Sequence, residues 1–290
     1  MQVVNEMLKD YEDYCHQQLS LVTGEQDRVY DDVIYAYQRY RFQLITECPR
    51  QVIVPDDLHI DEEHRQAYQQ IVSRIENGEA LWPYQSKNIE KVDFDDQMLC
   101  HWGVQHLHLG NTFRPDGFIK RTGPLLFAVF TDDKAYIVGF YAHQAWTKLS
   151  IIETIHKHWP KLLHEYKSDS CTETLTEQQI KVLRNKNANH TVVVSDGTQY
   201  LPPKGVNAAG APIEVTMKSA LIRNNLDHVF DVIKTNLKDI LARDTEGQHG
   251  ETITFGLIMD ATKKKLIYRI KETDFAFSLK KDPISYKLLC

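Results

Sequence analysis

The sequence predicts an α+β protein with N-terminal helices, a small antiparallel sheet with a flanking helix, and a second α+β unit. Apolar residues recur at helical spacing near the start of the chain and again over 218–241. Short β-type runs separated by turn signals fill 98–143 and reappear after 250. The content of 42% hydrophobic and 26% charged residues is ordinary for a folded globular protein.

The first 60 residues are expected to form an N-terminal helical region. The spacing of apolar residues predicts helices over 2–46, interrupted at Gly24. Residues 48–60 contain Pro49 and Pro55 and are interpreted as a connector.

A second region is expected over 61–165. A helix over 62–76 ends at Asn77-Gly78, and three strands follow at about 98–109, 124–130 and 135–143. The second and third strands predict an antiparallel hairpin, because the tight turn Thr131–Lys134 separates them. A helix over 147–158 closes this region.

Residues 168–290 are expected to form the C-terminal α+β unit. Thr176 and Gln179 fit a capping box for a helix that reaches Arg184, and 191–194 is a β run. An amphipathic helix is predicted over 218–241. A hairpin of 252–259 and 266–270, joined by a turn at 260–263, completes the unit.

Composition narrows the class of protein. The chain has no apolar run near the roughly 20 residues of a membrane span, and its start lacks the features of a secretory signal, so we expect a cytoplasmic protein without membrane contact. The five cysteines are scattered and predict reduced, mostly buried thiols: Cys15, Cys48, Cys100, Cys171 and Cys290. Residues 1–165 carry 16 Lys/Arg against 25 Asp/Glu, a charge of −9, and the remainder carries 18 against 15, or +3. This balance argues against binding nucleic acid by phosphate attraction alone.

Histidines gather in the predicted sheet. His106 and His108 are two residues apart in one strand and should therefore share a face. Arg121 precedes the second strand, and Tyr141 and His143 share a face at the end of the third. If the three strands are neighbours, these five side chains converge.

Such a set suits two kinds of chemistry. Metal-free RNA cleavage needs a base, an acid and a cation for the phosphorane, roles that histidine and arginine fill near neutral pH. Alternatively, His106, His108 and His143 could hold Zn²⁺ in a hydrolase, although no obvious carboxylate partner accompanies them. A third interpretation is a non-enzymatic protein-interaction module of a defence or regulatory system, in which the histidine strand is structural.

Residues 70–143 resemble the RelE/YoeB-type ribonuclease toxins of the barnase/EndoU/colicin/RelE-like superfamily. The matching segments are the helix before the sheet, Arg121-Thr122-Gly123-Pro124-Leu125-Leu126-Phe127, and Tyr136–His143. The resemblance implies an RNA substrate, no metal or other cofactor, and often the ribosome as platform. By position, it implies His106 or His108 as base, Arg121 as phosphate ligand and His143 as acid, with Tyr141 beside them. A toxin or phage-defence effector, in some cases with a protein inhibitor as partner, is the function that follows.

A further motif lies in the C-terminal unit. Arg184-Asn185-Lys186-Asn187-Ala188-Asn189-His190 fits the Arg-x₄₋₆-His pattern of helical HEPN ribonucleases. The favoured interpretation is a helix end followed by a loop, because a β run follows immediately. The Gly/Pro-rich loop at 202–212 has no Walker or Rossmann pattern, and the chain has no GxSxG.

Overall fold

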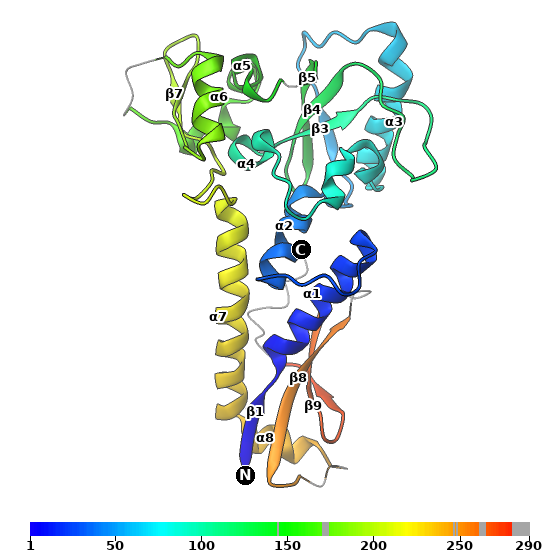
Figure 1. The fold of residues 1–290 in the computed structure, drawn as a ribbon, viewed down its shortest axis with the longest axis vertical. Helices are drawn as coiled ribbons and strands as arrows, with labels where there is room; N and C mark the ends of the chain where they lie inside the picture. Colours follow the sequence, from blue (N-terminus) through cyan, green and yellow to red (C-terminus); the bar gives the residue numbers. More distant parts are fainter. Residues whose placement is uncertain (144, 170–173, 246, 248, 261–264, 280–290) are drawn as a thin grey trace. The chain divides into compact units, whose positions relative to one another are not determined.

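The computed structural model confirms the α+β class (Figure 1). It describes residues 1–143, 145–169, 174–245, 247, 249–260 and 265–279. The chain divides into two compact units, Arg39–Glu214 and Met1–Gln38 with Val215–Cys290. This division differs from the expected regions 1–60, 61–165 and 168–290, because the two ends of the chain pair with each other and 168–214 pack with the preceding residues.

The unit Arg39–Glu214 is built on a mixed four-stranded sheet with strand order β2-β5-β4-β3. The three antiparallel strands and the hairpin of β4 and β5 agree with the sequence-based prediction. Residues 51–53, by contrast, lie in the predicted connector but form β2, which pairs parallel with β5. The elements of this unit are β2 (Gln51–Ile53), α3 (Glu62–Asn77), α4 (Gln97–Trp102), β3 (Val104–His108), β4 (Leu125–Phe130), β5 (Lys134–Tyr141), α5 (Leu149–His158), α6 (Glu177–Asn185), β6 (Val192–Val193) and β7 (Gln199–Tyr200).

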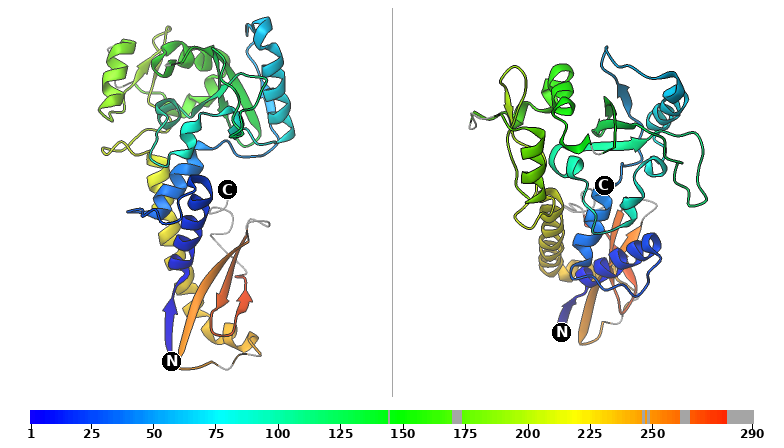
Figure 2. Two further views of the ribbon diagram at one scale, coloured as in Figure 1. Left: turned by 45° about the vertical axis from the view of Figure 1, so that its right-hand side comes forward. Right: turned by 45° about the horizontal axis from the view of Figure 1, so that its top comes forward.

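Both faces of this sheet are covered (Figure 2). Alternate residues of each strand point to opposite faces, so each strand supplies two cores. One core joins Leu107 and Leu126 to Ile71 and Ile75 of α3. The other joins strand residues to α4, α5 and the segment that contains β6 and β7, and its members are Met98, Trp102, Val104, Leu125, Phe127, Val138, Ala145, Ile151, Ile152, Ile155, Leu163, Val192, Val194 and Tyr200.

Residues 98–102 are helical, which corrects the predicted first strand. Asp96 caps α4, because its Oδ1 accepts hydrogen bonds from the backbone N–H groups of Met98 and Leu99 at 2.9 and 3.1 Å. Gly103, with φ of 68°, adopts the left-handed conformation that ends the helix. The strand therefore begins only at Val104.

The other unit contains a second sheet, of order β1-β8-β9-β10. Residues 2–5 were expected to be helical but form β1, which pairs parallel with β8. The predicted hairpin is present as β8 and β9; its turn at 260–263 falls mostly outside the described residues. The elements are β1 (Gln2–Asn5), α1 (Met7–Thr23), α2 (Val33–Gln43), α7 (Ile213–Thr235), α8 (Leu237–Arg243), β8 (Thr252–Asp260), β9 (Lys265–Ile270) and β10 (Phe275–Phe277), with α2 and α7 crossing the boundary between the units.

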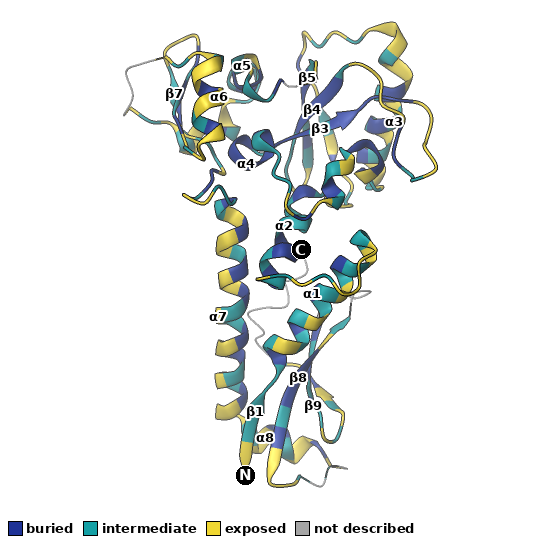
Figure 3. Ribbon diagram, viewed as in Figure 1, coloured by how far each residue is buried: buried dark blue, intermediate teal, exposed yellow. Residues whose placement is uncertain are grey.

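The helix predicted over 218–241 is two helices that meet at Asn236. Along α7, buried and exposed residues alternate with helical period, as the amphipathic pattern requires (Figure 3). Of the expected thiols, Cys15 and Cys100 are buried and Cys48 is partly buried, and all three are free. Cys171 and Cys290 lie outside the described residues.

Candidate active site

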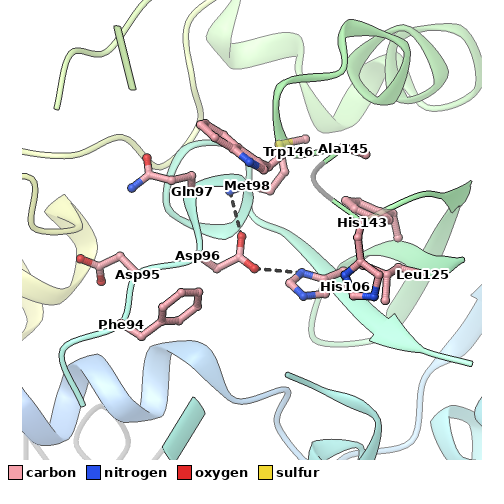
Figure 4. A pocket seen from close by; sticks show the side chains of 11 residues that line it. Phe94, Asp95, Asp96, Gln97, Met98, His106, Leu125, His143, Ala145 and Trp146 are labelled. Atoms are coloured by element: carbon pink, nitrogen blue, oxygen red, sulfur yellow. Dashed lines mark hydrogen bonds and ion pairs between the residues drawn. The ribbon is translucent and has the colours of Figure 1, made fainter. Parts of the chain in front are cut away.

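A pocket of about 240 Å³ opens beside the sheet face that carries the histidines (Figure 4). We call it the His106 pocket. Its walls come from the segment that leads into α4, from β3 and β4, and from the turn after β5. They are mostly apolar and aromatic, with two histidines and two carboxylates, and the lining residues are Phe94, Asp95, Asp96, Gln97, Met98, His106, Leu125, Phe127, His143, Ala145 and Trp146.

An aspartate and a histidine form a pair in this pocket. His106 lies on β3 opposite Phe127, on the same sheet face as Val104. Its Nδ1 is 2.9 Å from Oδ2 of Asp96, whose other oxygen caps α4. One carboxylate therefore fixes both the start of the helix and the orientation of the imidazole (Figure 4).

Asp96 is held as a carboxylate. Burial by itself would raise the pKa of this group, because only 16% of its side chain is exposed. The hydrogen bond and the charge of His106, together with the backbone N–H groups of Leu99 and Met98, outweigh burial, and the pKa of Asp96 lies below its usual value. The pair is therefore an ionised carboxylate that accepts Nδ1–H of His106.

Asp96 was missed in the sequence. The signal available was an aspartate directly before Gln97-Met98-Leu99, a typical helix N-cap. The β-type pattern over 98–109 predicts one continuous strand, and in a strand Asp96 has no helix to cap and no reason to face the histidines.

His108 is a buried, neutral imidazole. It lies opposite Leu125 with 2% of its surface exposed, and its Nδ1 has no hydrogen-bond partner in the described structure. Burial lowers the pKa of His108 to about 3, with smaller contributions from the charges of Arg121, His106 and His143. His108 does not line the pocket, and a ring with so low a pKa is a poor proton donor or acceptor at neutral pH.

The structure brings two of the five predicted residues into the His106 pocket. His143 is exposed in the turn after β5 and lines the pocket with His106. The ring of His108 bridges the two, with centroids 6.1 Å from His106 and 5.4 Å from His143.

Arg121 and Tyr141 lie outside this pocket. Arg121 is exposed, and its charge acts on His108. Tyr141 packs its ring edge-on against Phe127 at 5.2 Å and points its hydroxyl to the carbonyl of Ser150 at 3.5 Å. The predicted shared face is present, but the five side chains do not meet at one point.

The arginine and the histidine of the HEPN-like motif, Arg184 and His190, are buried, whereas residues 185–189 between them are mostly exposed. Helix α6 ends at Asn185, and His190 precedes β6, as the interpretation of a helix end and a loop requires. The buried Arg184 donates to the Trp146 carbonyl and to Met98 Sδ, two residues of the pocket wall. Burial lowers the pKa of Arg184 to about 10, against the opposing charge of Asp96.

The three histidines of the zinc alternative are not arranged as a set of metal ligands. Within the described residues, no group of three or more His, Cys, Asp or Glu side chains is placed to hold a metal ion. His106, His108 and His143 are neighbours through ring contacts rather than through nitrogens aimed at a common centre.

Comparison with protein-family models, with curated proteins and with solved structures finds no match. The RelE/YoeB resemblance therefore stays a prediction. None of the helices in the described ranges is both long and apolar enough to cross a membrane.

Proposed function

We propose that this protein is a metal-independent endoribonuclease whose active site is the His106 pocket. The observation that carries the proposal is the Asp96–His106 pair at 2.9 Å in a pocket that His143 also lines. Two histidines on one pocket supply the base and the acid that transfer of a phosphate ester requires. The aromatic walls of Phe94 and Trp146 suit a nucleobase, which binds proteins by stacking.

The pair defines which nitrogen is the base. Because Nδ1–H of His106 donates to Asp96, the lone pair is on Nε2. In the proposed reaction Nε2 takes the proton of the ribose 2′-hydroxyl, and the 2′-oxygen forms a bond to phosphorus. The bond from phosphorus to the 5′-oxygen breaks, and His143 gives that oxygen a proton. The products are a 2′,3′-cyclic phosphate and a free 5′-hydroxyl.

Arg121 is assigned to the charge of the phosphate. The guanidinium is exposed and lies within electrostatic range of His108, the ring that joins His106 to His143. A cation there stabilises the dianionic phosphorane. His108 supports the two reactive imidazoles by packing and is assigned no proton transfer.

A test uses 5′-labelled RNA and the purified protein in parallel reactions with and without EDTA. We expect cleavage with 2′,3′-cyclic ends, and a loss of at least about 100-fold in kcat/KM for His106→Ala and for His143→Ala. His228→Ala, which removes an exposed histidine of α7, is the matched control and should cleave as the wild type does. Cleavage that EDTA abolishes, or that survives in His106→Ala, would overturn the proposal.

The cellular role proposed is that of a toxin or phage-defence effector. Expression from a tightly controlled promoter should arrest growth and deplete RNA with the wild type only, and His143→Ala should do neither. Cleavage in vitro without growth arrest would remove the toxin role and leave the enzyme.

A further inference from the structure

Three nitrogen-bearing side chains form a buried cluster that the proposed reaction does not use. They are His101 of α4, Arg184 of α6 and His190, which precedes β6, and their exposed fractions are 0, 3 and 7%. The ring centroids of His101 and His190 are 5.9 Å apart, and the charge of Arg184 acts on both rings. All three residues belong to the unit Arg39–Glu214, and we call them the Arg184 cluster.

Arg184 is a buried cation without a carboxylate in contact. Its Nη1 donates to the Trp146 carbonyl and to Met98 Sδ, and both acceptors are neutral. The carboxylate whose charge acts on it, Asp96, is engaged with His106 and with the start of α4, and Arg184 forms no ion pair with any residue that the structure describes. A charge that leaves water is costly unless an opposite charge lies close to it.

The cluster also has donors that meet no acceptor in the described part of the chain. Arg184 Nε and both ring nitrogens of His101 are buried without a hydrogen-bond partner there. Arg184 Nε always carries a hydrogen, and one nitrogen of a neutral imidazole does so in either tautomer. His101 is neutral at pH 7, because burial and the charge of Arg184 lower its pKa to about 3. The cluster therefore supplies at least two N–H donors beside one positive charge.

His190 adds no further donor in its neutral form. Its Nδ1 lies 3.4 Å from the carbonyl of Ala188 and donates to it, so the unpartnered Nε2 keeps a lone pair. His190 therefore encloses the cluster, and the two donors come from Arg184 and His101.

The charge and the donors together select a small monovalent anion. A water molecule would satisfy the donors but would leave the guanidinium without a counter-charge. A divalent oxyanion would bury a surplus negative charge, since the cluster holds one fixed cation. With no more than 7% of any of the three residues exposed, a phosphate that is part of an RNA chain cannot reach them.

We propose that the Arg184 cluster binds a halide ion, chloride in the cell. Arg184 Nε and a ring nitrogen of His101 donate to the ion, and the ion balances the guanidinium. The site does not depend on the proposed ribonuclease. It supports the wall of the His106 pocket, because the same guanidinium holds Met98 and the Trp146 carbonyl in place.

Bromide is the probe for the position of the ion, since its anomalous X-ray scattering distinguishes it from water. Crystals of the full chain in sodium bromide should show an anomalous peak in contact with Arg184 Nε and the ring of His101. A cluster without a peak, or with a water molecule in that place, would overturn the proposal.

Thermal unfolding in sodium bromide and in sodium gluconate, at equal concentrations, tests binding in solution. The measured quantity is the Tm in bromide minus the Tm in gluconate, which removes the difference in basal stability between variants. We expect it to be at least about 3 °C more positive for the wild type than for Arg184→Met, which keeps the volume and removes the charge. The difference should increase with bromide concentration and then saturate.

Two more variants complete the test. His101→Phe keeps a ring but removes its donor, so it should also reduce the bromide response, and it serves if Arg184→Met fails to fold. Arg65→Met is the matched control, because Arg65 lies in the same unit with 49% of its side chain exposed, and it should respond as the wild type does. An equal bromide response in the wild type, Arg184→Met and His101→Phe would overturn the site.

Discussion

Replacing Asp96 with asparagine separates the two tasks of this side chain. Asparagine keeps an oxygen that can accept from Met98 N and Leu99 N, so the cap of α4 survives. It presents a neutral amide to His106 where the carboxylate stood. The ring can keep its hydrogen bond only by turning Nδ1 into an acceptor, and the proton then moves to Nε2.

The expected magnitudes follow from those bonds. Exchanging the charge-assisted bond for a neutral one should lower the free energy of unfolding by about 1–2 kcal/mol. An Nε2 that carries a proton cannot act as base, so kcat/KM should fall by about 10²–10⁴. Asp96→Ala also removes the cap of α4, so it should lower the free energy of unfolding by about 1 kcal/mol more than Asp96→Asn does.

Urea unfolding and RNA cleavage, measured on both variants at neutral pH, form the assay. Because the pKa of Asp96 is lowered by folding, its contribution to stability is present above the unfolded pKa and is lost as pH falls through the folded one. The stability gap between wild type and Asp96→Asn should therefore shrink in acid. Cleavage by Asp96→Asn at the wild-type rate would refute the role of the pair, and equal stability of the two variants would refute the cap.

Three further outcomes are expected. His101, His108 and His190 are buried with pKa values lowered to about 3, 3 and 4, so below about pH 6.5 the unfolded chain binds protons that the folded chain does not. Unfolding free energy should drop as pH falls from 6.5 to 5, by up to about 1.4 kcal/mol per pH unit for each ring, and urea titrations that show no slope would contradict this. Arg184→Ala should lower the free energy of unfolding by about 3 kcal/mol, because it leaves a cavity and an unpaired buried carbonyl. Arg184→Met should lower it less, since methionine refills the volume. Equal losses for the two variants in thermal unfolding would contradict the packing argument. Gly103→Ala should lower the free energy of unfolding by about 1–2 kcal/mol, because the φ of 68° strains a residue that has a Cβ. Steric contact adds nothing, since a Cβ there would meet no atom closer than 3.5 Å. A variant as stable as the wild type would show that the helix end can shift.

Local rules sufficed for much of the sheet. The turn Thr131–Lys134 between two β-type runs defines the hairpin of β4 and β5, and the structure has it with the expected pairing. The capping box of Thr176 and Gln179 is formed as predicted. In both places the residues that decide the structure are within a few positions of one another.

The errors fall where distant segments compete with local preference. Val3 and Val4 fit a helical pattern, but β8 offers them backbone partners about 250 residues later, and pairing in a sheet partly buries them. Residues 98–102 have the composition of a strand, but one carboxylate cap and one glycine make them a helix. The parallel partner of β5, β2, carries too short a pattern to be recognised.

The candidate site shows the same division between what local sequence rules predict and what contacts between distant segments decide. The period of two along a strand was enough to put His106 and His108 on one face and to direct attention to that face, because side-chain alternation is a property of the backbone alone. The packing of α4, β4 and the turn after β5 around the sheet decides the rest. It decides that His106 meets Asp96, that His108 is buried with no hydrogen-bond partner for its Nδ1 in the described structure, and that His143 faces solvent beside a pocket. Proton affinity follows burial and neighbouring charge, and these are fixed only when segments far apart in the sequence come into contact.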